Sequence, residues 1–322
     1  MAAVRRNVVT DTAARDAYVR GVKLLKAEQT TATTADFGIP GTPAPVRTYD
    51  LFVIWHHLAM NQPVPPGGDS SVRNRAHRGP VFLPWHRVML GVLEANLQRV
   101  LQEPEFGLPY WDWSADGDLA APQSATLWKP EWLGGQGRPV ADGPFAFRPG
   151  TPGTFRIRIE ATLDNNLRQV NRGLRRAFGR PNASPTLPGT DDVDLAYDTV
   201  ADPALATYDF SPWNTTSRGF RNRLEGFRGT GLHNQVHLWV GGDMLPASSP
   251  NDPVFYLHHC NVDRLWEGWM NRHGRTYLPT MAAPASLTGH RIDDEIVSPL
   301  GPAATPRSVL DPGTLYSYDT LP

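Results

Sequence analysis

The sequence LHNQVH, at residues 232–237, places His233 and His237 four residues apart. In an α-helix this spacing brings both side chains to one face, so the two imidazoles can share one metal ion. A Gly-Gly pair at residues 241–242 marks the end of such a helix. The stretch therefore predicts a core helix over about residues 231–240 that supplies two ligands of a metal site.

A third histidine for this site follows in the sequence NDPVFYLHH, at residues 251–259. The Asn-Asp pair and Pro253 predict the start of a new helix, because Asn and Asp cap helices and proline is tolerated at the first helical position. The inward face of that helix can present His259. Neighbouring helical residues point about 100° apart, so His258 and His259 cannot both face one metal.

A second group of three histidines, His56, His77 and His86, occurs earlier in the chain. His56 forms a doublet with His57, and again only one of the two can face a metal. Sites of three imidazoles, without a thiolate or an obvious carboxylate ligand, suit copper better than calcium, magnesium or an iron–sulfur cluster. The sequence therefore predicts two copper ions.

Apolar spacing and boundary residues predict four core helices, each with at least one candidate ligand: about 49–60, 84–101, 231–240 and 252–273. A fifth helix over residues 12–26 has no candidate ligand and is expected to pack outside them. The helix–loop–helix arrangement occurs twice. We therefore expect a mainly α fold, a four-helix bundle core that holds a dicopper site, with long loops and a few short edge strands.

The rest of the chain is rich in glycine and proline, with 29 and 31 residues respectively. Residues from about 114 to 215 show no sustained periodicity and predict loops and short helices. Near the end, the apolar segments 307–310 and 315–318 are expected to pair as edge strands. Because both histidine groups must meet in one core, we expect a single catalytic domain over residues 1–322.

Two longer sequences resemble the copper signatures of the type 3 dicopper family of tyrosinases, polyphenol oxidases and catechol oxidases, which includes o-aminophenol oxidase-like members. HRGPVFLPWHR at 77–87, followed by Glu94, is similar to the first signature, and DPVFYLHH at 252–259, followed by Asp263, to the second. Smaller similarities extend over most of the chain, including YSY at 316–318. The resemblance selects one histidine from each doublet and implies six copper ligands: His56, His77, His86, His233, His237 and His259.

The other four histidines are expected to be bystanders. We expect His57 to form a nearby hydrogen bond or to face solvent, and His258 to be a buried, hydrogen-bonded neighbour of the site. His273 lies near a predicted helix end and His290 in a predicted loop, so both are interpreted as surface or capping residues.

Two further residues are expected close to the ligands. Asp263 lies one turn after His259, where its carboxylate could orient an imidazole or pair with Arg264 or Arg87. Phe255 lies one turn before His259 and is expected to pack against the ligand rings.

The resemblance implies an enzyme that uses dioxygen to hydroxylate monophenols at the ortho position and to oxidise o-diphenols to o-quinones. A phenol with a pKa of about 10 is neutral at pH 7 and binds copper poorly. In the family, a glutamate and the asparagine after the first histidine of the second site are proposed to hold a water that takes this proton. Glu225 and Asn234 match those positions and favour monophenol hydroxylation. The alternative is a catechol oxidase or o-aminophenol oxidase without that activity.

Leu238 bears on the choice of substrate. It follows His237 directly, where some bacterial tyrosinases have an arginine. This weakens the expectation that a substrate carboxylate is bound at this point, and makes phenols without an amino-acid tail, or aminophenols, candidate substrates. Pro246 and Ala247, which precede the last helix, are expected to border the entrance.

Composition restricts the partners and the location. A net charge of -1 gives no reason to expect a nucleic acid or a membrane as partner, and a single cysteine, Cys260, excludes an intramolecular disulfide. Without an apolar leader or membrane span the protein is expected in the cytoplasm, although export with a copper-delivery helper protein, used by some bacterial relatives, stays open. Only four residues follow the YSY sequence, so no C-terminal shielding domain is expected.

Two other classes of protein are weighed against an oxidase. A haemocyanin-like oxygen carrier would use the same copper pair without turnover, but carriers are usually larger assemblies that shield the site. A dinuclear zinc or iron hydrolase normally recruits bridging carboxylates, and none lies at ligand spacing in either histidine group.

Overall fold

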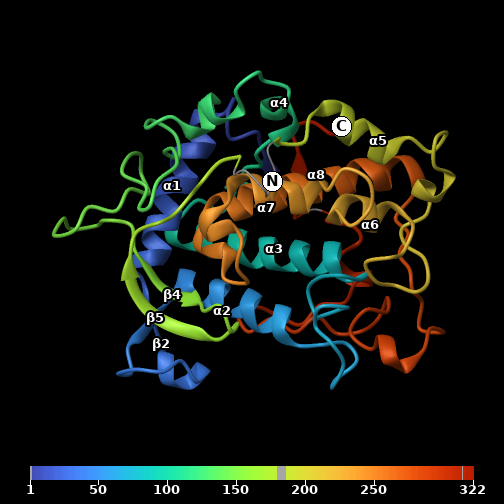
Figure 1. The fold of residues 1–322 in the computed structure, drawn as a ribbon, viewed down its shortest axis with the longest axis horizontal. Helices are drawn as coiled ribbons and strands as arrows, with labels where there is room; N and C mark the ends of the chain where they lie inside the picture. Colours follow the sequence, from blue (N-terminus) through green and yellow to red (C-terminus); the bar gives the residue numbers. More distant parts are fainter. Residues whose placement is uncertain (1, 180–185, 314) are drawn as a thin grey trace.

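Helices dominate the computed structural model, which describes residues 2–179, 186–313 and 315–322 (Figure 1). Its α-helices are α1 (Thr12–Ala27), α2 (Thr48–Asn61), α3 (Phe82–Leu101), α4 (Trp113–Gly117), α5 (Thr190–Tyr197), α6 (Phe220–Glu225), α7 (Leu232–Val240) and α8 (Val254–His273). The described strands pair into three two-stranded sheets: β1 (Ala3–Arg5) with β6 (Tyr316–Tyr318), β2 (Gln29–Thr33) with β3 (Pro45–Arg47), and β4 (Ile157–Ala161) with β5 (Leu167–Arg172).

The four predicted core helices are confirmed as α2, α3, α7 and α8. In Figure 1, α3 crosses the centre of the molecule, with α2 below it and α7 and α8 above. Every residue of α8 from Val254 to Met270 is buried, so this helix forms the middle of the core. Its start is capped as the sequence predicts, since Asp252 Oδ1 accepts a hydrogen bond from the N–H of Val254 at 3.0 Å.

The fifth predicted helix is α1, which lies beside the bundle at one edge of the molecule (Figure 1). Tyr18, Val22 and Leu25 on one face of it are fully buried, and the helix packs mainly against α3. Gly21 permits this close approach, because an added Cβ would lie 2.6 Å from Leu97 Cδ2 of α3. The helix is outside the four as expected, but it belongs to the core.

The expected pairing of residues 307–310 with 315–318 is wrong. Residues Arg307–Val309 form a short 3₁₀ helix, and β6 instead pairs in parallel with β1, at the other end of the chain. The buried Arg5 of β1 explains this partner, because its guanidinium lies 3.4 Å from the centroid of the Tyr316 ring and donates to Tyr318 Oη at 3.1 Å.

The expectation of loops and short helices between residues 114 and 215 is confirmed except for one hairpin, and residues 180–185 lie outside the described part of the chain. The hairpin is β4–β5, which packs against α2. Ile159 and Leu167 fill a small second core beside Ile54 of α2.

A network of buried charges joins the ends of the chain to α3 and α8. Arg5 pairs with Glu94 at 2.8 Å and with Asp263 at 3.1 Å, and Arg87 Nε lies 2.6 Å from Asp263 Oδ1. Of the pairings expected for Asp263, the one with Arg87 is present. Burial alone would raise the pKa of the Asp263 carboxyl, but the two guanidinium groups outweigh it and hold that pKa below its usual range.

No helix in the described part of the chain has both the length and the apolar character needed to cross a lipid bilayer.

Candidate metal centre

The first histidine group draws on two helices and a loop. α2 supplies His56, the loop before α3 supplies His77, and α3 supplies His86. One ring nitrogen from each lies within 4.8 Å of the others, and all three side chains are buried. Nδ1 of His56 donates to the carbonyl of Ala247 at 2.7 Å, and Nδ1 of His86 to that of Phe82 at 2.8 Å. Their Nε2 atoms are buried and have no protein partner among the described residues.

The loop that carries His77 is held by residues far away in the sequence. Asn74 Oδ1 accepts from the N–H of His77 at 2.8 Å. His290 then joins both ends of the loop: its Nε2 donates to the carbonyl of Asn74 at 2.9 Å, and its Nδ1 accepts from the N–H of Val81 at 3.3 Å. His290 is fully buried, so the prediction of a surface or capping residue is wrong. No local pattern in its sequence marks this role.

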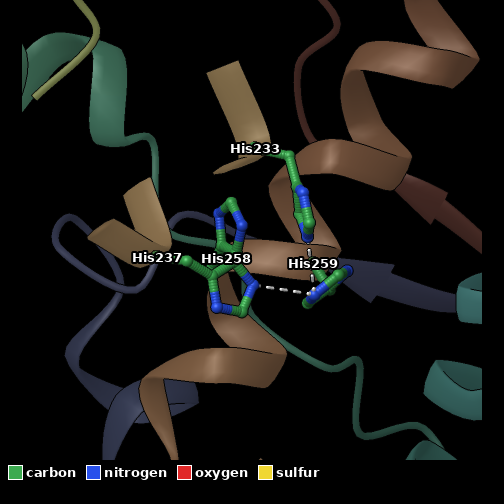
Figure 2. A group of neighbouring side chains, drawn as sticks. All are labelled: His233, His237, His258 and His259. Carbon is green, nitrogen blue, oxygen red and sulfur yellow. Dashed lines mark hydrogen bonds between the residues drawn. The ribbon is translucent and has the colours of Figure 1, made fainter. Parts of the chain in front are cut away.

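The second group is assembled from α7 and α8 (Figure 2). The rings of His233 and His237 turn towards His259, and their Nε2 atoms lie 3.3 and 3.4 Å from His259 Nε2. Nδ1 of His237 donates to the carbonyl of Met244 at 2.7 Å. Nδ1 of His233 lies 3.2 Å from the carbonyl oxygen of Glu225 and 3.1 Å from Asn234 Oδ1.

These hydrogen bonds test whether the residues fit a metal. Because carbonyl oxygens can only accept, the Nδ1 atoms of His56, His86, His233 and His237 carry the ring proton, and each Nε2 has a free lone pair. In each group such lone pairs point towards one place, an arrangement that a cation would stabilise. Separations of 3.3 and 3.4 Å also suit two nitrogens on one ion with metal–nitrogen bonds of about 2.0–2.1 Å.

Burial and neighbouring charges also favour the neutral form of the imidazole rings. Burial lowers the pKa of His56 to about 3 and that of His237 to about 4. It also lowers the pKa values of His77, His86, His233 and His259 well below the usual value, and neighbouring histidines add to the effect. All six imidazoles are therefore neutral at pH 7, the form that binds a metal.

The two groups adjoin each other. The rings of His86 and His259, one from each group, stack with centroids 4.1 Å apart and planes within 8°. Phe255 packs against His56 and His259 at centroid distances of 5.1 and 4.2 Å, as the sequence predicts. Phe82 packs against His86 at a centroid distance of 4.9 Å, and was not singled out in the sequence although it lies one turn before that ligand. The arrangement can hold two metal ions side by side.

The bystander histidines differ from expectation at one further position. His258 is fully buried and its ring stacks on His233 at 5.1 Å, but neither of its nitrogens has a hydrogen-bond partner among the described residues. The expected hydrogen bond of His258 is therefore wrong, and its ring nitrogens also lie near those of the second group. His57 has the expected bond, from Asn61 Nδ2 at 3.0 Å, and His273 packs beside Trp269 in the last turn of α8.

A cavity of about 330 Å³ opens onto both groups. Glu225 and Asn234 both line it, and so do Leu238 and Pro246. Ala247 is not among the lining residues. It is buried and its carbonyl holds His56, so only Pro246 borders the cavity as expected.

The Glu225 carboxylate is buried and held from two sides. Oε1 accepts from the backbone N–H of Arg78 at 2.6 Å, and Oε2 accepts from Arg221 Nη1 at 2.9 Å. Burial raises the pKa of Glu225 above its usual value, and the Arg221 guanidinium only partly opposes this. A carboxylate of raised pKa at a cavity wall is suited to accept a proton.

Comparison with known proteins agrees with this geometry. Residues 46–272 match the family described as the common central domain of tyrosinase. The chain is 42% identical over 278 residues to a tyrosinase of Streptomyces glaucescens, an alignment that covers 84% of this chain and 89% of the relative. It is 38% identical over 269 residues to a grixazone synthase of Streptomyces griseus, covering 76% and 81% of the two chains.

Solved structures share the fold at lower identity. A polyphenol oxidase of Thermothelomyces thermophila superposes with a TM-score of 0.66 at 22% identity, over 100% of this chain and 89% of that one. A functional unit of octopus haemocyanin gives a TM-score of 0.54 at 20% identity, over 99% and 68% of the two chains. The fold thus occurs in a protein named as a polyphenol oxidase and in one named as a haemocyanin.

Proposed function

The chain belongs to the tyrosinase family and is a copper-dependent oxidase of monophenols and o-diphenols, and we propose that Glu225 and Asn234 hold the water that deprotonates the monophenol. The proposal rests on one observation: the two side chains line the same cavity as four of the six candidate ligand histidines. A neutral phenol must lose its proton before its oxygen can bind a metal well, and a buried carboxylate can take that proton through one water.

The copper ions are proposed to bind to His56, His77 and His86 in one site and to His233, His237 and His259 in the other. When bound, the copper pair supplies the reduction of dioxygen. The protein keeps the imidazoles neutral and fixes four of them through their Nδ1–H bonds. Phe255 and Phe82 limit the water around the rings, because they cover both groups with apolar surface.

The proton step assigns different tasks to the two residues. The phenol O–H gives its proton to the held water, and the water passes a proton to a carboxylate oxygen of Glu225, so that a phenolate and a neutral carboxyl group result. The Asn234 amide, partly exposed at the start of α7, orients the water from the other side. A catechol needs the same site for oxidation but depends less on this step, because one of its two hydroxyl protons is lost more readily.

The test compares monophenols with catechols. Initial oxygen uptake is measured for the copper-loaded protein with 4-substituted phenols, the matching catechols and o-aminophenols, beside Glu225→Gln and Asn234→Ala. We expect the monophenol rate to fall by about 100-fold in Glu225→Gln and by about tenfold in Asn234→Ala, with catechol rates within about threefold of the unmodified protein. Equal losses for both substrates would remove the proposed role from the pair.

A second candidate function is oxidation of catechols or o-aminophenols without monophenol hydroxylation. The relative named grixazone synthase shows that the family includes proteins with names other than tyrosinase. Turnover of catechols or o-aminophenols alone, in the same assay, would favour this candidate. Steady turnover of any of these substrates is not expected of an oxygen carrier.

A copper-delivery helper protein is also proposed as a partner. Its support is the apolar rim of the cavity, where Leu238 and Leu245 are 39% and 45% exposed and a partner could cover them. Copper-free protein that takes up two equivalents of free copper and reaches full activity unaided would contradict this proposal.

A further inference from the structure

We infer that Arg221 is a positioning residue for the reaction: it fixes the carboxylate of Glu225 at the cavity wall, and Asp209 anchors it in turn. The inference rests on the proposed role of Glu225 and goes beyond it, because Arg221 is not among the residues that line the cavity. It acts on the substrate only through Glu225.

Arg221 is completely buried in α6, one turn before Glu225. Its Nη1 donates to Glu225 Oε2 at 2.9 Å and its Nε to Asp209 Oδ2 at 2.8 Å. Nη2 donates to the carbonyl of Asn214 at 3.0 Å. Each of the three guanidinium nitrogens is therefore bonded, and the planar group has one orientation.

The Glu225 carboxylate is consequently clamped between two parts of the chain. Arg221 holds Oε2 from α6, and the N–H of Arg78 holds Oε1 from the loop that carries His77. Arg78 has a φ of 64°, a left-handed conformation that is uncommon for an arginine. The peptide next to a candidate copper ligand is thus turned towards Glu225, and the carboxylate is placed relative to that ligand.

A second buried arginine, Arg176, provides a comparison, because its carboxylate partner does not line the cavity. Arg176 and Asp252 are both buried and form a bidentate pair, with Nε–Oδ2 and Nη2–Oδ1 distances of 2.7 and 2.8 Å. Arg221 instead serves two carboxylates that are both buried, and one of them faces the cavity. Asp209 therefore holds the same guanidinium that contacts Glu225, the carboxylate at the cavity wall.

The test uses a substitution that keeps the charge but loses the planar fork. Arg221→Lys is compared with the unmodified protein, Glu225→Gln and the double variant, each loaded with copper and normalised to copper content. The measured quantity is the ratio of the initial rate with a 4-substituted phenol to that with the matching catechol. Arg176→Lys is the matched control, because it alters a buried arginine–aspartate pair that does not contact Glu225.

We expect Arg221→Lys to lower the phenol-to-catechol ratio about tenfold, and to lower it no further when Glu225→Gln is already present. Arg176→Lys is expected to lower the thermal midpoint while leaving the ratio unchanged. If Arg221→Lys reduces both rates equally, or adds its full effect to that of Glu225→Gln, its role is structural and the inference is overturned.

The design separates the two proposals. A ratio that falls in Glu225→Gln but not in Arg221→Lys overturns the inference alone. A ratio unchanged in Glu225→Gln overturns the proposed role of Glu225, and the inference with it. If Arg221→Lys does not fold, Asp209→Asn replaces it. This variant removes the anchoring charge without changing shape and is expected to lower the ratio about threefold, and an unchanged ratio would overturn the inference.

Discussion

Single hydrogen bonds decide which nitrogen of each histidine can bind metal. The carbonyls of Ala247, Phe82 and Met244 each accept a hydrogen bond from the Nδ1–H of one ring and so leave its Nε2 without a proton. His258 differs from these rings because neither of its nitrogens is bonded to a described residue. Its ring stacks on His233, whereas His259 Nε2 lies 3.3 Å from His233 Nε2. The geometry therefore favours His259 as the third ligand of the second site.

Substitution of each member of this doublet tests the choice. We expect His259→Asn to lose about one equivalent of bound copper, because removing one of three imidazoles from a site weakens metal binding severely. His258→Asn is expected to retain two equivalents and to lose stability, since a buried ring is replaced by a smaller side chain. Metal analysis after gel filtration measures both, and copper loss in His258→Asn alone would reverse the assignment.

At the scale of elements, a loop and a distant histidine act together. The loop that presents His77 has no helix or strand of its own between α2 and α3. His290 supplies the missing rigidity because it accepts from Val81 and donates to Asn74, which requires a neutral ring. Burial lowers the pKa of His290 to about 3, with smaller effects from Arg73 and Arg221.

The hydrogen bonds of His290 to this loop make the stability of the folded protein depend on pH. The pKa of His290 is about 3 when folded and about 6.5 when unfolded, so its contribution is complete above about pH 6.5 and is lost as pH falls towards 3. Between pH 7 and pH 5 this loss amounts to about 2 kcal/mol. We expect copper-free His290→Leu to have a lower free energy of unfolding in urea at pH 7 than the unmodified protein. This free energy should also change less between pH 7 and pH 5 in the variant. An identical pH dependence in the variant would contradict the prediction.

At the scale of the whole molecule, the buried Arg5 side chain holds the two ends of the chain against the helix bundle. Arg5 is fully buried between Glu94 of α3 and Asp263 of α8, and its guanidinium covers the Tyr316 ring of β6. A buried cation of this kind is tolerated only while its partners are present. The parallel pairing of β1 with β6 therefore depends on the interior of the bundle.

Removal of this cation should weaken the whole fold. Arg5→Met leaves two buried carboxylates without their shared partner, and we expect it to lower the free energy of unfolding by about 3–5 kcal/mol. Arg20→Met is the control, because Arg20 and Glu103 form an exposed ion pair, 53% and 46% accessible, worth less than about 1 kcal/mol. Denaturant unfolding measures both variants. A loss in Arg5→Met no larger than that in Arg20→Met would show that the network contributes little.

Much of the candidate metal centre could be predicted from the sequence, because the patterns that mark it lie within short continuous stretches of the chain. The four-residue spacing of His233 and His237, the cap at Asp252 and the apolar repeat of α3 act within single helices. The copper signatures are likewise continuous stretches. Predictions from these features agree with the helices and with the grouping of the six candidate ligands. Asn234 and Glu225 were found by the same means and line one cavity.

Only the tertiary structure decided which distant groups surround those residues. The burial of His290, the pairing of β6 with β1 and the clamp of Arg221 on Glu225 join positions that share no local pattern. The residues that flank a single arginine or histidine in the sequence do not show whether its side chain is solvated or buried. Its role is set by desolvation and by the partners that packing brings within about 3 Å, and these exist only once the chain has folded.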